Sequence, residues 1–146
     1  MIIAIASDHA GYLLKTKIKA HLEAKAISVE DFGTFKDEPV DYPDYGILAA
    51  RFVAQNKADF GILVCGSGIG MSIVANKVKG IRAALCTSEE MAELSRQHND
   101  ANVLTLGGRL TEHQYALRIV DTWLKTPFEG GRHFRRINKI HQLSGL

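Results

Sequence analysis

The residues best suited to chemistry lie in one stretch, where an apolar run ends in a cysteine and alternating glycines. Residues 60–64 read Phe-Gly-Ile-Leu-Val, and Cys65 is followed by Gly66-Ser67-Gly68-Ile69-Gly70. Glycines permit the tight turn and positive φ that let successive backbone N–H groups point at one spot. The next residues have the pattern of a short helix, whose N-terminus adds positive potential there. As a thiolate, Cys65 could take a proton from carbon or attack an electrophile.

Two other interpretations of this stretch stay open. Cys65 could be a small buried core residue. A glycine turn between a strand and a helix also often binds a phosphate without doing chemistry. The G-x-G-x-G spacing differs from the G-x-G-x-x-G of dinucleotide-binding turns, and no G-K-[ST] closes a P-loop. The stretch therefore predicts an anion-binding turn that carries a thiol.

Other polar side chains follow other predicted strands. Asp8 and His9 come after the strand of residues 1–7, and Arg109 after the strand of residues 103–106. Ligands gather where parallel strands end, so we expect these residues near Cys65. His98 lies at the end of a helix instead, and one chain offers it no obvious route to Cys65. Asp8, His9 and His98 could move protons between oxygens, although Asp8 could also be only a helix N-cap.

Three arginines could clamp a phosphate. Arg132 and Arg136 are four residues apart and share one face of a predicted C-terminal helix, and Arg109 is the third. The alternative is a solvated basic surface on that helix. Cys86 has neither a glycine turn nor a basic cluster after it, so we interpret it as structural.

The elements that must position these residues alternate between strands and helices. Strands are predicted at 1–7, 27–33, 60–65, 81–86 and 103–106, with helical patterns after each of them. Capping boxes are expected at Thr87–Glu90 and Thr111–Gln114, and Pro43 suits the first turn of another helix. Five such alternations imply a parallel sheet covered on both faces.

Composition limits the classes of protein that fit. The chain has 146 residues, 46% of them hydrophobic and 23% charged, as in a globular protein of one domain, 1–146. No segment approaches the roughly 18 apolar residues of a membrane span, and no signal peptide is recognisable. A net charge of +2 is too small to indicate a nucleic-acid partner. The two cysteines indicate a reduced, cytoplasmic protein.

Five motifs in a fixed order carry a resemblance to a known family. They are Ser7-Asp8-His9-Ala10-Gly11, Asp41-Tyr42-Pro43, Cys65-Gly66-Ser67-Gly68-Ile69-Gly70, Ser95-Arg96-Gln97-His98-Asn99-Asp100-Ala101-Asn102 and Glu129-Gly130-Gly131-Arg132-His133. Together they resemble the type B ribose-5-phosphate isomerases of the ribose/galactose isomerase family, collinearly from Ile2 to about Ile140. The resemblance implies a three-layer α/β/α, Rossmann-like (flavodoxin-like) domain with a five-stranded parallel sheet and an extra C-terminal helix.

The resemblance also implies a reaction and its catalytic residues. Ribose 5-phosphate and ribulose 5-phosphate would interconvert through a cis-enediol(ate), with Cys65 carrying the proton between C1 and C2. Ser67 would assist it, and the turn Gly66, Gly68, Ile69 and Gly70 would form the anion hole. Asp8 and the partner's His98 would open the sugar ring. One subgroup of the family uses a Glu after the last glycine as base, but Met71 stands there in this chain.

The remaining site residues implied by the resemblance bind the substrate. His9, Arg132, Arg136 and the partner's Arg109 would hold the phosphate, with Arg135 as an extra basic neighbour of Arg136. The partner's Asn99 would lie near the sugar, and Tyr42 would line the pocket. The resemblance implies a homodimer with shared sites, and two such dimers could pair into a tetramer. No cluster of His, Asp, Glu and Cys has convincing metal-ligand spacing, so neither a metal nor a cofactor is expected.

Two other functions stay open on the sequence alone. One is a hexose-6-phosphate isomerase of the same family, acting on allose or galactose 6-phosphate, because one more hydroxymethylene changes binding by only a few kcal/mol. The other is a phosphosugar-binding module without activity. Such a module would need the glycine turn and the arginines, but neither Cys65 nor His98.

Overall fold

Strands and helices alternate in the computed structural model, which describes residues 1–146. The strands are β1 (Ile2–Ser7), β2 (Ser28–Asp31), β3 (Phe60–Cys65), β4 (Ala83–Leu85) and β5 (Val103–Gly107). The helices are α1 (Tyr12–Glu23), α2 (Tyr42–Ala54), α3 (Ile69–Asn76), α4 (Glu89–Asn99), α5 (His113–Lys125) and α6 (Arg132–Ser144). The predicted α/β class, five strands and C-terminal helix are confirmed.

All five strands are parallel, in the order β2-β1-β3-β5-β4. Flavodoxin-like sheets commonly have the strand order 2-1-3-4-5, and relative to that order β4 and β5 are exchanged here. Here the fully buried β5 pairs with β3, with Cys65 opposite Gly107, and the three-residue β4 forms the edge. The turn after β5 consequently lies beside the turn that follows Cys65.

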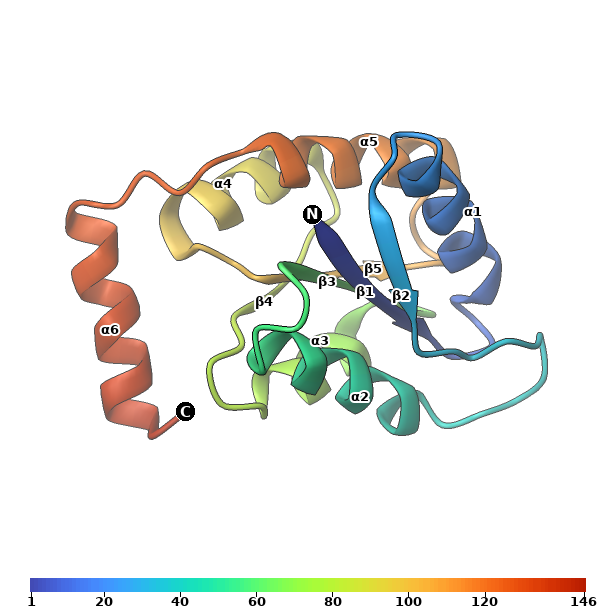
Figure 1. Cartoon of the computed structure of the whole chain (residues 1–146), viewed down its shortest axis with the longest axis horizontal. Coiled ribbons are helices and arrows are strands. Elements are labelled where there is room, and N and C mark those ends of the chain that lie inside the picture. The colour runs from blue at the N-terminus through green and yellow to red at the C-terminus, as the bar shows by residue number, and fades with distance from the viewer.

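Helices cover both faces of the sheet, as Figure 1 shows, and a hydrophobic core lies under each layer of helices. Helices α1, α4 and α5 cover one face, where Ile5, Ile62 and Trp123 are fully buried. Helices α2 and α3 cover the other, with Leu63 and Met71 in its core. Alternate residues of β1 and β3 serve opposite faces, as period-two strands require. None of the six helices has the length and apolar character needed to cross a membrane.

The helix caps differ in detail from the expected capping boxes. Ser88, not Thr87, caps α4 and accepts a hydrogen bond from the Met91 N–H. Glu112, not Thr111, caps α5, and its carboxylate accepts from two N–H groups, which lower its pKa. Asp8 is no helix cap, because Gly11 occupies the N-cap position of α1.

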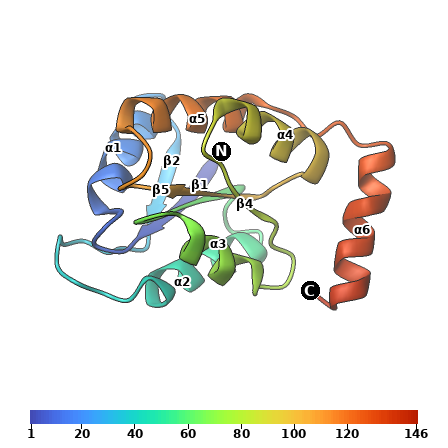
Figure 2. The ribbon, with the colours of Figure 1, turned by 180° about the vertical axis from the view of Figure 1, so that it is seen from behind.

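Helix α6 stands at one end of the molecule, past the ends at which the strands begin, where Arg82 just before β4 contacts it (Figure 1). The view from behind shows the same separation between α6 and the α1 end of the sheet (Figure 2). The end of the chain returns toward the body, where the Gly80 N–H donates to the Leu146 carbonyl oxygen at 2.8 Å. The fold therefore offers two separate places for functional residues: the loops at the strand ends, and the region of α6.

Candidate functional site

A cleft of about 590 Å³ opens where β1, β3 and β5 end. Its lining consists of Asp8, Tyr42, Cys65, Gly66, Ser67, Ile69, Gly70, Ile73, Arg109 and Leu110. Asp8 follows β1, Cys65 ends β3, and Arg109 follows β5. The structure thus brings the predicted strand-end residues together within one chain, with the exception of His9.

Cys65 is a buried residue at the wall of this cleft, 4% exposed. Its Sγ accepts a hydrogen bond from the Gly68 N–H at 3.2 Å. The next side chain, Ser67, accepts from the Ile69 N–H at 3.2 Å through its Oγ. Both donors belong to the turn that leads into α3, so the backbone presents N–H groups to the reactive side chains as the glycine pattern predicted.

The glycines of the turn have separate roles, which corrects the expectation that all three take positive φ. Only Gly68 does, with φ +82°, and a Cβ there would lie 2.6 Å from Leu85 Cδ1. A Cβ on Gly70 would lie 2.7 Å from Cζ of Tyr42, so this position must be bare for the Tyr42 ring to pack against the turn. Gly66 has neither constraint.

Backbone hydrogen bonds fix the two charged residues of the cleft. The Asp8 carboxylate accepts from the Gly11 N–H at 2.9 Å, which leaves its second oxygen without a protein donor. The Arg109 N–H donates to the Gly66 carbonyl at 3.1 Å, joining the loop after β5 to the glycine turn. The Arg109 side chain also lies against the glycine turn, since a Cβ on Gly66 would lie 3.7 Å from Arg109 Nη1. A carboxylate and a guanidinium therefore flank the thiol.

His9 lies beside the cleft and lines a neighbouring cavity of about 430 Å³ with residues of the loop before α2. The Val40 N–H donates to His9 Nδ1 at 3.1 Å. This bond makes Nδ1 the acceptor, so Nε2 carries the proton and is the free donor of the ring. His9 is thus prepared to donate to an anion.

The remaining predicted site residues gather around α4 and α6, outside the cleft. His98 near the end of α4 stacks on His133 of α6, with ring centroids 4.4 Å apart and planes 11° apart. Burial lowers the pKa of His133, and the charges of His98, Arg132 and Arg136 lower it further. These cationic groups are therefore near one another, at the opposite end of the molecule from α1.

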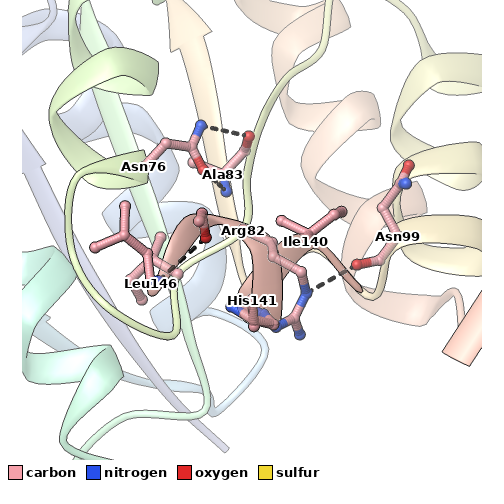
Figure 3. Close-up of a pocket in the computed structure, with 9 residues that line it drawn as sticks. Asn76, Arg82, Ala83, Asn99, Ile140, His141 and Leu146 are labelled. Carbon is pink, nitrogen blue, oxygen red and sulfur yellow. Dashed lines mark hydrogen bonds between the residues drawn. The ribbon is translucent and has the colours of Figure 1, made fainter. Parts of the chain in front are cut away.

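Asn99 lines a different cavity, of about 360 Å³, between α6 and the body (Figure 3). Its walls include Arg82, Ile140 and His141, with the chain end at Leu146. Figure 3 shows the Arg82 side chain reaching to the Asn99 carbonyl oxygen. Asn99 is consequently held on the side of α4 that faces α6.

Comparison with known proteins identifies the family. A family model described as ribose/galactose isomerase matches residues 3–140. The chain belongs to this family.

Individual family members are similar over nearly their whole length. Ribose-5-phosphate isomerase B of Escherichia coli is 49% identical over 138 residues, which cover 94% of this chain and 93% of that protein. The structure of Clostridium thermocellum ribose-5-phosphate isomerase B superimposes with a TM-score of 0.98 at 52% identity, covering 99% and 98% of the two chains. The Mycoplasma genitalium enzyme, solved with bound ribulose 5-phosphate, superimposes with a TM-score of 0.95 at 48% identity, covering 99% and 96%.

The grouping of the arginines differs from the one expected from the family resemblance. Arg109 was expected to reach the site from the partner, yet it lines the Cys65 cleft of its own chain. Arg132 and Arg136 were expected on the same chain as Cys65, yet they accompany His98 near α4 and α6. The reason is the direction of the strands. Arg109 follows β5 beside β3, at the carboxyl ends where the Cys65 cleft opens, whereas α6 and the end of α4 pack beside Arg82, where β4 begins.

Sequence reasoning missed a cluster of metal-ligating groups. The ligand atoms of His98, Glu129 and His133 lie within 4.8 Å of one another, although no such cluster was predicted. Two imidazoles and a carboxylate suit Zn²⁺, while Arg132 and Arg136 oppose a cation there. The signal in the sequence was the four-residue spacing of Glu129 and His133, whose Oε2 and Nε2 atoms lie 3.6 Å apart.

Cys86 behaves as the sequence predicted. It is 1% exposed in the core, and burial raises its pKa to about 11. Such a thiol is neither an available nucleophile nor a base at neutral pH. Cys65 is therefore the one cysteine placed for chemistry.

Proposed function

We propose that this chain is a ribose-5-phosphate isomerase, which interconverts D-ribose 5-phosphate and D-ribulose 5-phosphate. The observation that carries the proposal is the Cys65 thiol at the wall of a cleft, with a backbone N–H on its sulfur and Asp8 and Arg109 beside it. The bound ribulose 5-phosphate of the Mycoplasma genitalium relative supports the substrate class. The whole chain would act as one domain in the cytoplasm.

Isomerisation needs a base that moves a proton between neighbouring carbons. In the proposed mechanism the Cys65 thiolate takes the C2 proton of the open-chain aldose and returns it to C1. The negative charge passes to O1 in the cis-enediolate, where N–H groups of the glycine turn would stabilise it. O1 then takes the proton of the C2 hydroxyl, and when the Cys65 thiol protonates C1 the C2 carbonyl of the ketose forms and the thiolate is regenerated. Ser67 would orient the substrate hydroxyls, and Tyr42 would close one wall of the cleft.

Ring opening and phosphate binding require more residues than one cleft contains. Asp8 would exchange a proton with the ring oxygens together with His98 of the partner subunit. Because Arg132, Arg136 and Asn99 accompany His98 on α4 and α6, we propose that all four reach the site from the second subunit of a homodimer. Arg109 and the Nε2–H of His9 would meet the phosphate from the chain that carries Cys65.

An isomerase assay on purified protein tests the function. D-Ribose 5-phosphate, D-allose 6-phosphate and D-galactose 6-phosphate are supplied separately, and ketose formation is followed for wild type, Cys65→Ala and the buried-thiol control Cys86→Ala. Ribose 5-phosphate should be the best substrate, and only Cys65→Ala should abolish its turnover. Preference for a hexose phosphate would favour the other family activity, and phosphosugar binding without turnover would favour a binding module.

A further inference from the structure

Arg82 joins the ends of two helices that carry site residues. Its Nε donates to the Asn99 carbonyl at 2.9 Å and its Nη2 to the Asp100 carbonyl at 2.8 Å, at the C-terminal end of α4. Its Nη1 lies 2.9 Å from Nε2 of His141 on α6. A guanidinium only donates, so His141 must accept through Nε2. One side chain thus connects β4, α4 and α6, as Figure 3 illustrates.

Arg82 is held through its backbone as well as through its side chain. The Arg82 backbone N–H donates to Asn102 Oδ1 at 2.8 Å, and the Asn102 amide in turn donates to the Gly80 carbonyl at 2.9 Å. The Arg82 side chain is 19% exposed, and burial lowers its pKa. A charged group withdrawn from water in this way depends on its hydrogen bonds, so its loss leaves two helix-end carbonyls and one imidazole unpaired.

The end of α4 has a second support that does not involve α6. Arg96 donates to Asp100 Oδ1 at 2.8 Å and to the Ala101 carbonyl. Arg96 therefore holds the turn that ends α4 against the body. Arg82 is different, because it alone among these arginines also bonds a side chain of α6.

We propose that Arg82 is a positioning residue that holds the α4 end and α6 together as one unit, so that His98, Asn99, Arg132 and Arg136 enter the partner's cleft in a fixed arrangement. The proposal rests on the proposed function and its shared site. Arg82 itself lies on the cavity of Figure 3 rather than on the Cys65 cleft, and it would not touch substrate. Its effect would pass through the residues on the two helices.

Subunit mixing separates this role from a general effect on folding. Arg82→Ala should lower kcat/KM by about tenfold or more, the loss expected from charged hydrogen bonds, whereas the exposed control Arg51→Ala should leave it unchanged. Mixed with Cys65→Ala subunits under exchange, Arg82→Ala should recover about a quarter of wild-type activity, because half the dimers are mixed and one of their two sites is intact. Mixed with His98→Ala subunits it should gain nothing, because each site of the mixed dimer then has a defective α4–α6 half, one through Arg82 and the other through His98.

The outcomes distinguish this inference from the function on which it rests. Recovery in the control mixture of Cys65→Ala with His98→Ala shows the shared site, and its absence overturns both the shared site and the role of Arg82. If that control recovers but Arg82→Ala recovers with neither subunit, its damage is general and the inference is wrong. Wild-type kcat/KM in Arg82→Ala also overturns it.

His141 provides a second variant that leaves the α4 contacts of Arg82 in place. His141→Ala should raise KM about threefold to tenfold with little change in kcat, because it removes the contact of Arg82 with α6, which carries the arginines, and keeps the contacts with α4, which carries His98. His141→Gln keeps an acceptor for Arg82 and should restore most of the affinity. An unchanged KM in His141→Ala, or an equal rise in both variants, would contradict the connection to α6.

Discussion

Replacing Gly68 by alanine tests whether the glycine turn depends on close packing against the neighbouring strands or is a flexible loop. The chain offers a matched control in Gly80, since both residues have nearly the same positive φ, +82° and +85°. A Cβ on Gly68 would lie 2.6 Å from Leu85 Cδ1 and 2.9 Å from the Leu106 carbonyl carbon. A Cβ on Gly80 would meet nothing within 4 Å. The two substitutions therefore share the backbone strain and differ only in the contact.

The magnitudes follow from these two contributions. The strain of a left-handed alanine lowers the free energy of unfolding by about 1–2 kcal/mol in both variants. The contact with backbone and Leu85 adds about 1–3 kcal/mol in Gly68→Ala alone. At about 3 °C of melting temperature per kcal/mol for a chain of this size, Gly68→Ala should melt about 3–9 °C below Gly80→Ala.

Urea unfolding and isomerase kinetics at one protein concentration measure both effects. Gly68→Ala should also lose kcat, because the shifted turn moves the N–H that donates to Cys65 Sγ, whereas Gly80→Ala should keep it. Equal stability of the two variants together with wild-type kcat in Gly68→Ala would refute the idea that the turn is built around this close approach.

Other predictions follow from the same structure. Iodoacetamide at pH 8 should label Cys65 before Cys86, because at a pKa of about 11 only about one Cys86 thiol in a thousand is ionised at that pH. Ribose 5-phosphate should protect Cys65, and mass spectrometry that finds Cys86 labelled first would contradict the prediction. Dialysis against EDTA should leave activity unchanged, because N–H groups of the glycine turn would stabilise the oxyanion and the charges of Arg132 and Arg136 oppose a cation at the His98, Glu129 and His133 cluster; loss restored by a divalent ion would contradict it. Lys15→Met should lower the free energy of unfolding by about 2–4 kcal/mol, since Lys15 Nζ donates to Asp31 and to the Thr34 carbonyl; denaturant curves check this. Burial lowers the pKa of Lys15, so the unfolded state binds more protons just below pH 10.5, and the wild-type protein should gain stability relative to Lys15→Met as pH rises through that range.

Local patterns predicted the elements of the fold better than their arrangement. The apolar run before Cys65 and the helical spacing of Leu14, Ile18 and Leu22 predicted β3 and α1, because burial on the sheet imposes these periods. No sequence pattern showed that β5, and not β4, pairs with β3. Either strand could follow a crossover helix, and the choice depends on which strand tolerates full burial beside β3.

The candidate site was predictable where topology alone determines position. Asp8, Cys65 and Arg109 follow parallel strands, and parallel strands end at one edge of the sheet. Arg82 was not predictable, because nothing in the residues around it shows that β4 brings its side chain between α4 and α6. The direction of α6 was also hidden, since Gly130 and Gly131 both take positive φ before it and the chain can leave them in many directions.

The chemistry of the two groups of residues explains why a shared site is the natural arrangement. The Cys65 cleft contains a base and a carboxylate but only one arginine, and no histidine among its lining residues. The α4–α6 cluster contains two arginines and two histidines but no thiol. Proton transfer at carbon needs the base of the Cys65 cleft. Binding a doubly charged phosphate and protonating a ring oxygen need the arginines and histidines on α4 and α6. The fold holds the two groups at different ends of one chain, and in the proposed homodimer a second copy would bring them together. Removing either group from one subunit should then disable one site of the dimer while leaving the other intact.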